Sequence, residues 1–214
     1  MKPIDTSIEH LAIARQLLLE PTGLDETHLN RALAEIFGHR VDYADLYFQF
    51  TRSEGWSLEE GIVKSGSFAI DRGVGVRAVS GDKTAFAYSD EINEQALLSA
   101  ARATRTIARN GAGRIKVAGA MNPVSGHALY ATDDPIARHE AEMKVELLGR
   151  IERIARARDP RIVQVMAGLA AEYDVVLVAR SDGVMAADVR PLVRVSVTVI
   201  AEQAGRREQG HGGG

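Results

Sequence analysis

The 214-residue sequence contains no cysteine. Disulfide bonds and thiolate metal sites are therefore excluded within it, and such a chain suits a reducing cytoplasm. No apolar run approaches the roughly 20 residues that a helix needs to cross a bilayer. The first residues, MKPIDTSIEH, also lack the apolar segment of a signal peptide. We therefore expect a cytoplasmic protein with no membrane partner.

The sequence also has no excess of positive charge. Lys and Arg number 26 against 29 Asp and Glu, which leaves a net charge of -3. This balance indicates no basic surface for direct nucleic-acid binding. Aromatic residues make up only 5% of the chain, but hydrophobic residues make up 45%, which is enough for a sizeable core.

Helical periodicity occurs in four stretches. Two lie in the first forty residues. The second is expected to begin at Asp25 as N-cap, to bury Leu29, Ala32, Leu33, Ile36 and Phe37, and to end at Gly38. A third helix is expected over 93–110.

The fourth helix is expected over 136–158. Its predicted core face contains Leu147, Leu148, Ile151, Ile154 and Ala155. Its solvent face is predicted to hold ion pairs four residues apart: Glu140 with Lys144, Glu146 with Arg150, and Glu152 with Arg156.

Strand-like alternation fills most of the remaining chain. From residue 41, Leu46, Phe48 and Phe50 share one face, and near the end Val193, Val195, Val197 and Val199 do the same. Asp182-Gly183 predicts a hairpin with a type I′ turn. The order of helices and strands predicts an α+β fold, a two-layer sandwich with long helices packed on a mostly antiparallel sheet.

The glycine-bearing stretch DRGVGVRAVSGDKTAF permits three interpretations. A phosphate-binding loop would require a third glycine and a following helix, and both are missing. A strand with a bulge or a close backbone approach is the second. The third is an edge strand to which an extended peptide adds. On that third interpretation the candidate substrate-binding residues are Gly73, Val74, Gly75, Val76 and Arg77.

No catalytic or metal-binding pattern is visible in the sequence. The six histidines (His10, His28, His39, His127, His139 and His211) include no pair four apart on one helix, and no H-E-x-x-H motif occurs. We interpret them as structural or surface residues. Trp56 and the aromatic residues of LYFQF are expected to lie in the core.

Several blocks in order resemble one family. VDYADLYFQ, WSLEEGIVKSGS, DRGVGVRAVSGDKTAFAYSD and SDGVMAADVRPLVRVSVTV are similar to the N-terminal domain of the TldD/PmbA family, and more to its TldD side. The resemblance covers nearly all of the chain from about residue 41.

The resemblance implies a zinc metallopeptidase, also described as a modulator of DNA gyrase. In that family a TldD-like subunit pairs with a PmbA/TldE-like one, and the heterodimer cleaves extended or unfolded peptides. The family's metal ligands lie on an H-E-x-x-x-H helix in a C-terminal domain, and this sequence lacks that motif. We therefore expect no catalytic residue and no cofactor in this chain, which would be inactive alone.

These inferences set the expected domain organisation. Residues 1–204 are predicted to form one N-terminal α+β domain, and 205–214, RREQGHGGG with the glycine before it, a linker toward a C-terminal metallopeptidase domain. The expected role is substrate holding and subunit pairing, with the paired partner being a PmbA/TldE-like subunit or a second copy. The strand Val193–Ile200 is a further candidate for peptide holding. The alternative is a non-catalytic interaction or regulatory module.

Overall fold

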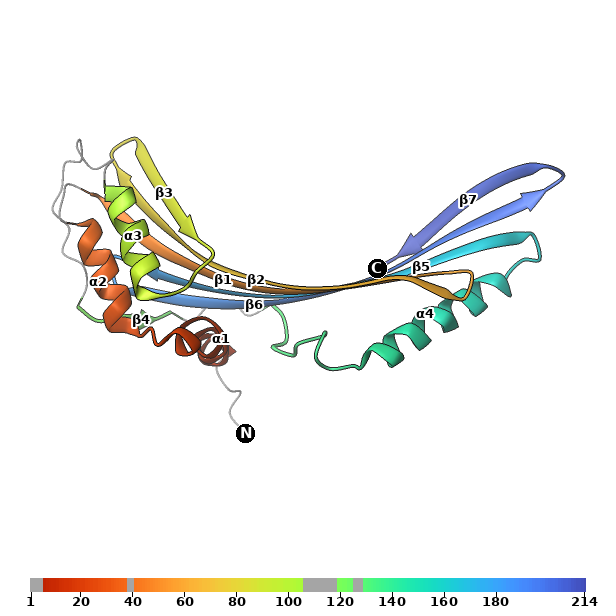
Figure 1. Ribbon diagram of the computed structural model, residues 1–214, viewed down its shortest axis with the longest axis horizontal. Helices are drawn as coiled ribbons and strands as arrows, with labels where there is room; N and C mark the ends of the chain where they lie inside the picture. The colour runs from red at the N-terminus through yellow and green to blue at the C-terminus, as the bar shows by residue number, and fades with distance from the viewer. Residues whose placement is uncertain (1–5, 38–40, 106–118, 125–128) are drawn as a thin grey trace. The chain divides into compact units, whose positions relative to one another are not determined.

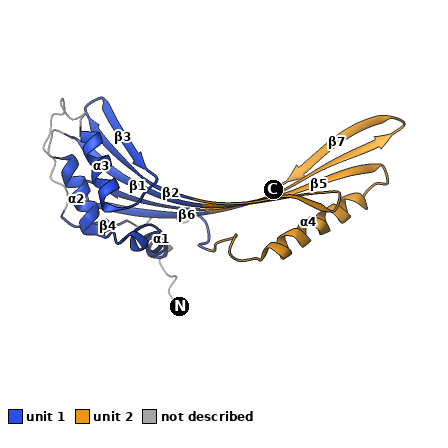
Figure 2. Cartoon of the chain, in the orientation of Figure 1, with its two compact units in different colours: residues 1–51, 71–132, 174–190 blue, residues 52–70, 133–173, 191–214 orange. Residues whose placement is uncertain are grey.

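A computed structural model describes residues 6–37, 41–105, 119–124 and 129–214 (Figure 1). The chain forms two compact units (Figure 2). Unit 1 comprises residues 1–51, 71–132 and 174–190, and unit 2 comprises 52–70, 133–173 and 191–214. The single domain predicted over 1–204 is therefore divided, and four long strands contribute residues to both units.

The strands form one mostly antiparallel sheet in the order β3-β2-β1-β5-β6-β4, with β7 also pairing β6. The short parallel pair of β4 and β6 is the exception. Together with its helices, this sheet confirms the predicted α+β class. The strand bounds are β1 Tyr43–Glu59, β2 Ile62–Ser80, β3 Lys83–Ser89, β4 Asn122–Pro123, β5 Ile162–Arg180, β6 Val184–Gln203 and β7 Arg206–Gly213.

Tight turns connect the antiparallel neighbours. Glu60 and Gly61, between β1 and β2, both have positive φ (53° and 73°), as a type I′ turn requires. The predicted hairpin at Asp182-Gly183 is present, but its predicted turn type is wrong, because only Gly183 has positive φ (85°). The Gly183 amide donates to the carbonyl oxygen of Arg180 at 3.0 Å, so the loop is a three-residue turn that ends at Gly183 in the left-handed conformation.

The first helices belong to unit 1. α1 (Thr6–Ala14) continues into a π-helical turn (Arg15–Leu19) and a 3₁₀ turn (Glu20–Thr22) that stops at Gly23, where φ is 69°. α2 (Glu26–Ile36) follows, and α3 (Glu94–Arg105) packs against both α2 and β3. The predicted helix over 93–110 is thus confirmed as far as Arg105, and its last residues lie outside the described ranges.

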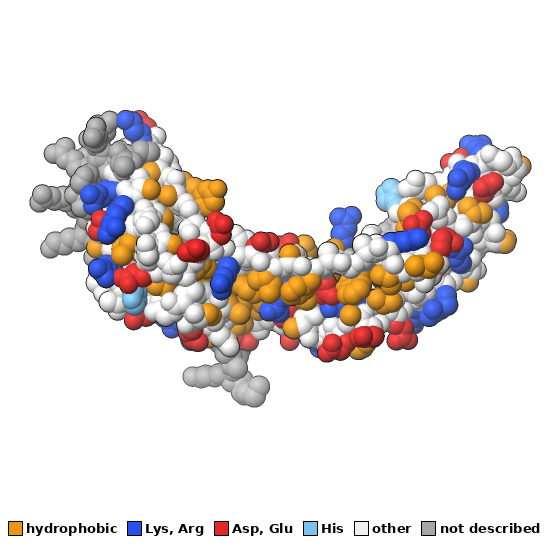
Figure 3. Space-filling model, in the orientation of Figure 1, with side chains coloured by type: hydrophobic (Ala, Val, Ile, Leu, Met, Phe, Trp, Pro, Cys, Tyr) orange, Lys and Arg blue, Asp and Glu red, His pale blue; other side chains and the backbone are white. Residues whose placement is uncertain are grey.

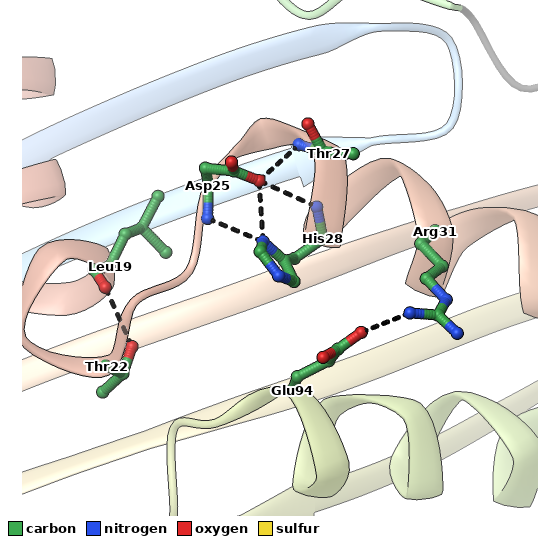
Figure 4. A network of polar contacts seen from close by, with 7 residues as sticks. All are labelled: Leu19, Thr22, Asp25, Thr27, His28, Arg31 and Glu94. Carbon is green, nitrogen blue, oxygen red and sulfur yellow. Dashed lines mark hydrogen bonds and ion pairs between the residues drawn. The ribbon is translucent and has the colours of Figure 1, made fainter.

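The N-terminus of α2 is capped as predicted. The Asp25 carboxylate accepts hydrogen bonds from the amides of Thr27 (2.9 Å) and His28 (3.1 Å), as Figure 4 shows. Those donors lower the pKa of Asp25, the His28 amide most of all. Four members of the predicted stripe are fully buried: Leu29, Ala32, Leu33 and Ile36. The fifth, Phe37, is only half-buried, because the helix ends at Ile36 and Phe37 is its C-cap.

Unit 2 is built around α4 (Ala141–Arg156). A buried cluster of Leu58, Leu148, Ala167 and Leu169 joins this helix to β1 and β5. Trp56, predicted to lie in the core, packs against this cluster and is partly buried.

The predicted core face of α4 is wrong in part. Leu147 and Ile154 are 42% and 51% exposed, whereas Lys144 and Glu152, predicted to face solvent, are buried. Only one of the three predicted ion pairs appears among the described contacts, that of Glu152 with Arg156 at 3.1 Å. Among the described residues, no helix is both long and apolar enough to cross a membrane.

The end of the chain differs from the predicted linker. Arg206–Gly213 form β7, which pairs with β6 from Ser196 to Gln203. A Cβ on Gly213 would lie 2.4 Å from the Val195 carbonyl oxygen, so glycine permits the close approach of these two strands.

Candidate functional site

A shallow trough lies on the open face of the sheet in unit 1. It has a volume of about 470 Å³ and is formed by residues from β1, β2 and the β3 region. We call this hollow the trough. The residues that line it are Tyr47, Gln49, Thr51, Asp71, Arg72, Gly73, Val74, Gly75, Phe86, Tyr88, Ser89 and Asp90.

The floor of the trough is made by two glycines of β2. A Cβ on Gly75 would lie 2.9 Å from the ring of Phe86, and a Cβ on Gly73 would lie 2.8 Å from the carbonyl oxygen of Ser89. The missing side chains therefore let the aromatic ring and the neighbouring backbone approach β2 closely. This agrees with the second interpretation of the stretch, a strand with close backbone contacts.

Two aromatic residues of β3 form one wall. Phe86 and Tyr88 are 64% and 76% exposed, and their rings stack with centroids 6.4 Å apart and planes 24° apart. They alternate with small Ala85 and Ala87, which places both rings on the same face of the strand. Sequence reasoning missed them, although the alternation in KTAFAYSD was a usable signal.

The opposite wall is polar and fixed by a buried carboxylate. Gln49 Nε2 and Thr51 Oγ1 donate to Asp174 Oδ1 at 2.8 and 2.7 Å, and Asp174 is 7% exposed. Burial, and secondly the charge of Asp174, raise the pKa of Tyr47. The Tyr47 hydroxyl therefore stays protonated near neutral pH and can donate a hydrogen bond toward the trough.

The structure divides the predicted substrate-binding residues. Gly73, Val74 and Gly75 line the trough, whereas Val76 is fully buried on the core side of the sheet. Arg77 forms an ion pair with buried Asp45, and its guanidinium lies 5.7 Å from the centre of the Tyr43 ring. The hydrogen bond to Asp45 raises the pKa of Arg77.

The backbone of this segment is not a free edge. Val74–Arg77 pair with Ser89–Phe86 of β3, so a peptide cannot add to β2 there as an extra strand. The second candidate strand is similar, because Ser196–Ile200 pair with β7. Any peptide held by Gly73–Gly75 therefore has to lie across the sheet face, within the trough.

The described part of the chain does not fit a metal ion. Within it there is no group of three or more His, Asp or Glu side chains close enough to bind one. His10 is buried with its Nδ1 3.7 Å from Asp188, and His28 belongs to the cap of α2. His39 and His127 lie outside the described residues.

Unit 2 contains a second hollow, of about 480 Å³, beside α4. Its apolar side chains include Met143, Leu147 and Val193. At its base Lys144 forms a buried ion pair with Glu54, and Glu54 also accepts from Trp56 Nε1. The sequence carried no signal for this pair, because its members lie 90 residues apart. Charges of both signs are interspersed on the face shown in Figure 3.

Comparison with known proteins places both units in one family. Residues 44–108 match the model described as PmbA/TldA metallopeptidase domain 1, and residues 134–214 match the PmbA/TldA metallopeptidase central domain. The chain is 49% identical over 195 residues to a protein of Haemophilus influenzae named metalloprotease TldD homolog. It is 38% identical over 204 residues to a protein of the same name from Buchnera aphidicola.

The alignments cover 90% and 95% of this chain but only 40% and 42% of those relatives, so the chain spans about two fifths of their length. Two solved structures titled modulators of DNA gyrase, from Bacteroides thetaiotaomicron and Thermotoga maritima, share the fold with TM-scores of 0.67. Their identities are 12% and 15%; both alignments cover 88% of this chain, and 44% and 42% of those chains. TldE from Thermococcus kodakarensis is similar with a TM-score of 0.59 at 14% identity, over 86% of this chain and 41% of that one.

Proposed function

Because the chain belongs to the TldD/PmbA family of metallopeptidases, we propose that it is the substrate-holding and subunit-pairing part of a TldD-type peptidase. The whole enzyme would cleave extended or unfolded peptides in the cytoplasm. The observation that carries the holding role is the trough of unit 1, which contains three of the predicted binding residues beside an exposed aromatic pair.

The trough suits a peptide held with little regard to sequence. The exposed rings of Phe86 and Tyr88 offer apolar surface on which many side chains can pack. The Tyr47 hydroxyl and the Gln49 amide oxygen offer a donor and an acceptor to a peptide backbone. The glycine floor lets that backbone come close to the sheet.

We propose that peptide hydrolysis takes place in another part of the enzyme. The described residues do not fit a metal, so we propose that zinc is held by the part of the relatives' length that this chain does not span. The chain alone is then inactive. The proposed partner is a PmbA/TldE-like subunit or a second copy, and the similarity to the fold of TldE supports a partner of the same architecture.

A non-catalytic regulatory module is the second candidate. It is favoured by the lack of a metal-binding group among the described residues and by the gyrase-modulator titles of two structural neighbours. A module of this kind need not hold peptides in the trough, so peptide binding separates the two functions.

The test is the affinity of the chain for an unstructured, fluorophore-labelled peptide of about ten residues, measured by fluorescence anisotropy. Removing an aromatic contact costs about 1 kcal/mol beyond lost area, so Tyr88→Ala and Phe86→Ala should each weaken binding about tenfold. Tyr130→Ala removes another exposed aromatic of unit 1, 51% exposed and outside the trough, and should change nothing. Equal affinities for all four proteins would contradict the holding role.

A further inference from the structure

A second surface lies on β2 within unit 2. The residues from Ile62 to Arg72 are all exposed, over eleven successive positions of the strand. On one side β2 neighbours β1, and on the other β3 pairs only with Val74–Ser80. Within the described ranges, the outer edge of Ile62–Ile70 therefore faces no strand. Such an edge presents backbone donors and acceptors to another chain.

The side chains along this edge are unusually apolar for an exposed strand. Ile62, Phe68 and Ile70 are 59%, 61% and 50% exposed, and their even spacing places them on one face. Natural edge strands are usually protected by charge, proline or bulges. Here Lys64 is the one charged residue between Ile62 and Ile70. This edge therefore has the character of a binding surface rather than of a protected edge.

The order of residues on this edge indicates what covers it. The stretch IVKSGSFAI is nearly the same in both directions about Gly66. If two copies pair antiparallel with Gly66 opposite Gly66, Ile62 meets Ile70 and Ser65 meets Ser67. Lys64 then meets the ring of Phe68, a favourable contact of a cation with an aromatic face.

This register also avoids like charges. A pairing in which Lys64 faces its own copy would place two ammonium groups opposite each other, which is destabilising. Gly66 suits the centre, because the Trp56 ring already lies over it, 2.9 Å from where a Cβ would stand. In this register each residue of one β2 strand and the residue opposite it on the other point to the same face of the joined sheet.

We infer that this edge binds a second copy of the chain, through antiparallel pairing of β2 strands centred on Gly66. The interface is isologous, with each β2 supplying the same residues to its partner. It specifies the self-pairing part of the proposed function and does not depend on peptide holding in unit 1. A strand pair of nine residues buries less than a standard interface, so the dimer should be weak and reversible.

The natural absence of cysteine allows a test of the register. Opposed Cα atoms lie about 5 Å apart, close enough for a disulfide. Lys64→Cys mixed with Phe68→Cys should form inter-chain disulfides under mild oxidation. Each variant alone should form at least about tenfold less, because two copies of one position are offset by about 13 Å along the strands. Ile154→Cys, exposed on α4, mixed with Phe68→Cys is the control for random collision.

Sedimentation velocity tests the dimer without cross-linking. Phe68→Lys sets two ammonium groups opposite each other and should weaken association more than tenfold, while adding Lys64→Glu should restore it through an ion pair across the two copies. Circular dichroism checks that Phe68→Lys folds normally, as expected because the Phe68 side chain is exposed. A wild-type chain that stays monomeric at 100 µM, or disulfides that form equally in all mixtures, would overturn the inference.

The same variants separate this inference from peptide holding. Phe68 lies in unit 2, outside the trough, so Phe68→Lys should leave peptide affinity unchanged. Loss of the dimer with intact peptide binding supports the pairing surface. A dimer that persists in Phe68→Lys refutes it, whatever the peptide does.

Discussion

At the scale of single residues, the buried ion pair of Lys144 and Glu54 is the interaction with the largest expected effect on stability. Each side chain is only 9% exposed, and Lys144 also donates to the carbonyl oxygen of Ile136 at 2.9 Å. Removing one partner of a buried pair leaves the other charge without compensation. The pair therefore holds the start of α4 onto β1.

We predict that Lys144→Met lowers the free energy of unfolding by about 3 kcal/mol, because Glu54 stays buried without its cation. Urea denaturation followed by circular dichroism measures the change. Adding Glu54→Leu should recover most of the loss, since no charge is then left buried. The control is Arg206→Ala, whose exposed pair with Glu208 should contribute almost nothing. A loss no larger in Lys144→Met than in Arg206→Ala would contradict the role of the pair.

A second residue-scale prediction concerns pH. Arg161 lowers the pKa of Asp159 from 3.8 to about 2, mainly through its side-chain hydrogen bonds and then through its backbone amide. Because the folded pKa lies below the unfolded one, the stabilisation is complete above about pH 4 and is lost as pH falls toward 2. Arg161→Ala should move the Asp159 pKa upward, as measured by NMR titration of its carboxyl carbon. An unchanged pKa would show that the guanidinium is not its cause.

At the scale of elements, the close contact of β6 with β7 depends on one glycine. The amide of Val195 donates to the carbonyl oxygen of Gly214 at 2.8 Å, and Gly214 returns a bond of 3.0 Å. Gly213 lies next to this pair, opposite Ser196, and a Cβ there would collide with the Val195 carbonyl oxygen, whereas a Cβ on Gly212 would meet nothing within 4 Å.

We therefore predict that Gly213→Ala, but not Gly212→Ala, releases the end of β7. Hydrogen exchange at the Val195 amide should become about tenfold faster in the first variant, because local opening then costs about 1.4 kcal/mol less. The second variant should match the wild type. Equal exchange in both variants would mean that β7 tolerates a wider separation from β6.

The extent of sequence prediction also differs between elements. The Asp25 cap and the stripe of α2 follow from local chemistry, and the structure confirms the cap and the four stripe residues within the helix. The face of α4 could not be fixed in the same way. Leu147, Leu148, Ile151 and Ile154 form a stripe over about a third of its circumference, but the buried residues are Lys144, Leu148 and Glu152. Burial of Lys144 alongside Leu148 depended on a carboxylate from another strand, which periodicity does not reveal.

The trough shows the same limit. Of the three interpretations of its glycines, the close backbone approach agrees with the floor of the trough, and the free edge does not. The pairing of Val74–Arg77 with β3 closes that edge, and it also places Phe86 and Tyr88 above the glycines. The two strands form a local hairpin, and the alternation in KTAFAYSD puts both rings on one face, but the closeness of Phe86 to Gly75 was seen only in the structure.

At the scale of the whole molecule, the two units divide the proposed work. The trough lies in unit 1 and the candidate pairing edge in unit 2. The two family domain matches follow the sequence rather than these units, since residues 44–108 include 52–70 of unit 2 and residues 134–214 include 174–190 of unit 1. No change of composition marks the division, because β1, β2, β5 and β6 each contribute residues to both units.

The central claim is that the trough holds an extended peptide, and NMR on the isotopically labelled 23.1 kDa chain tests it most directly. On titration with an unstructured peptide, we expect the amide shifts to concentrate at Gly73–Gly75 and at Phe86–Asp90, and Tyr88→Ala to suppress them. Shifts confined to other surfaces, or a saturable response that Tyr88→Ala leaves intact, would contradict it.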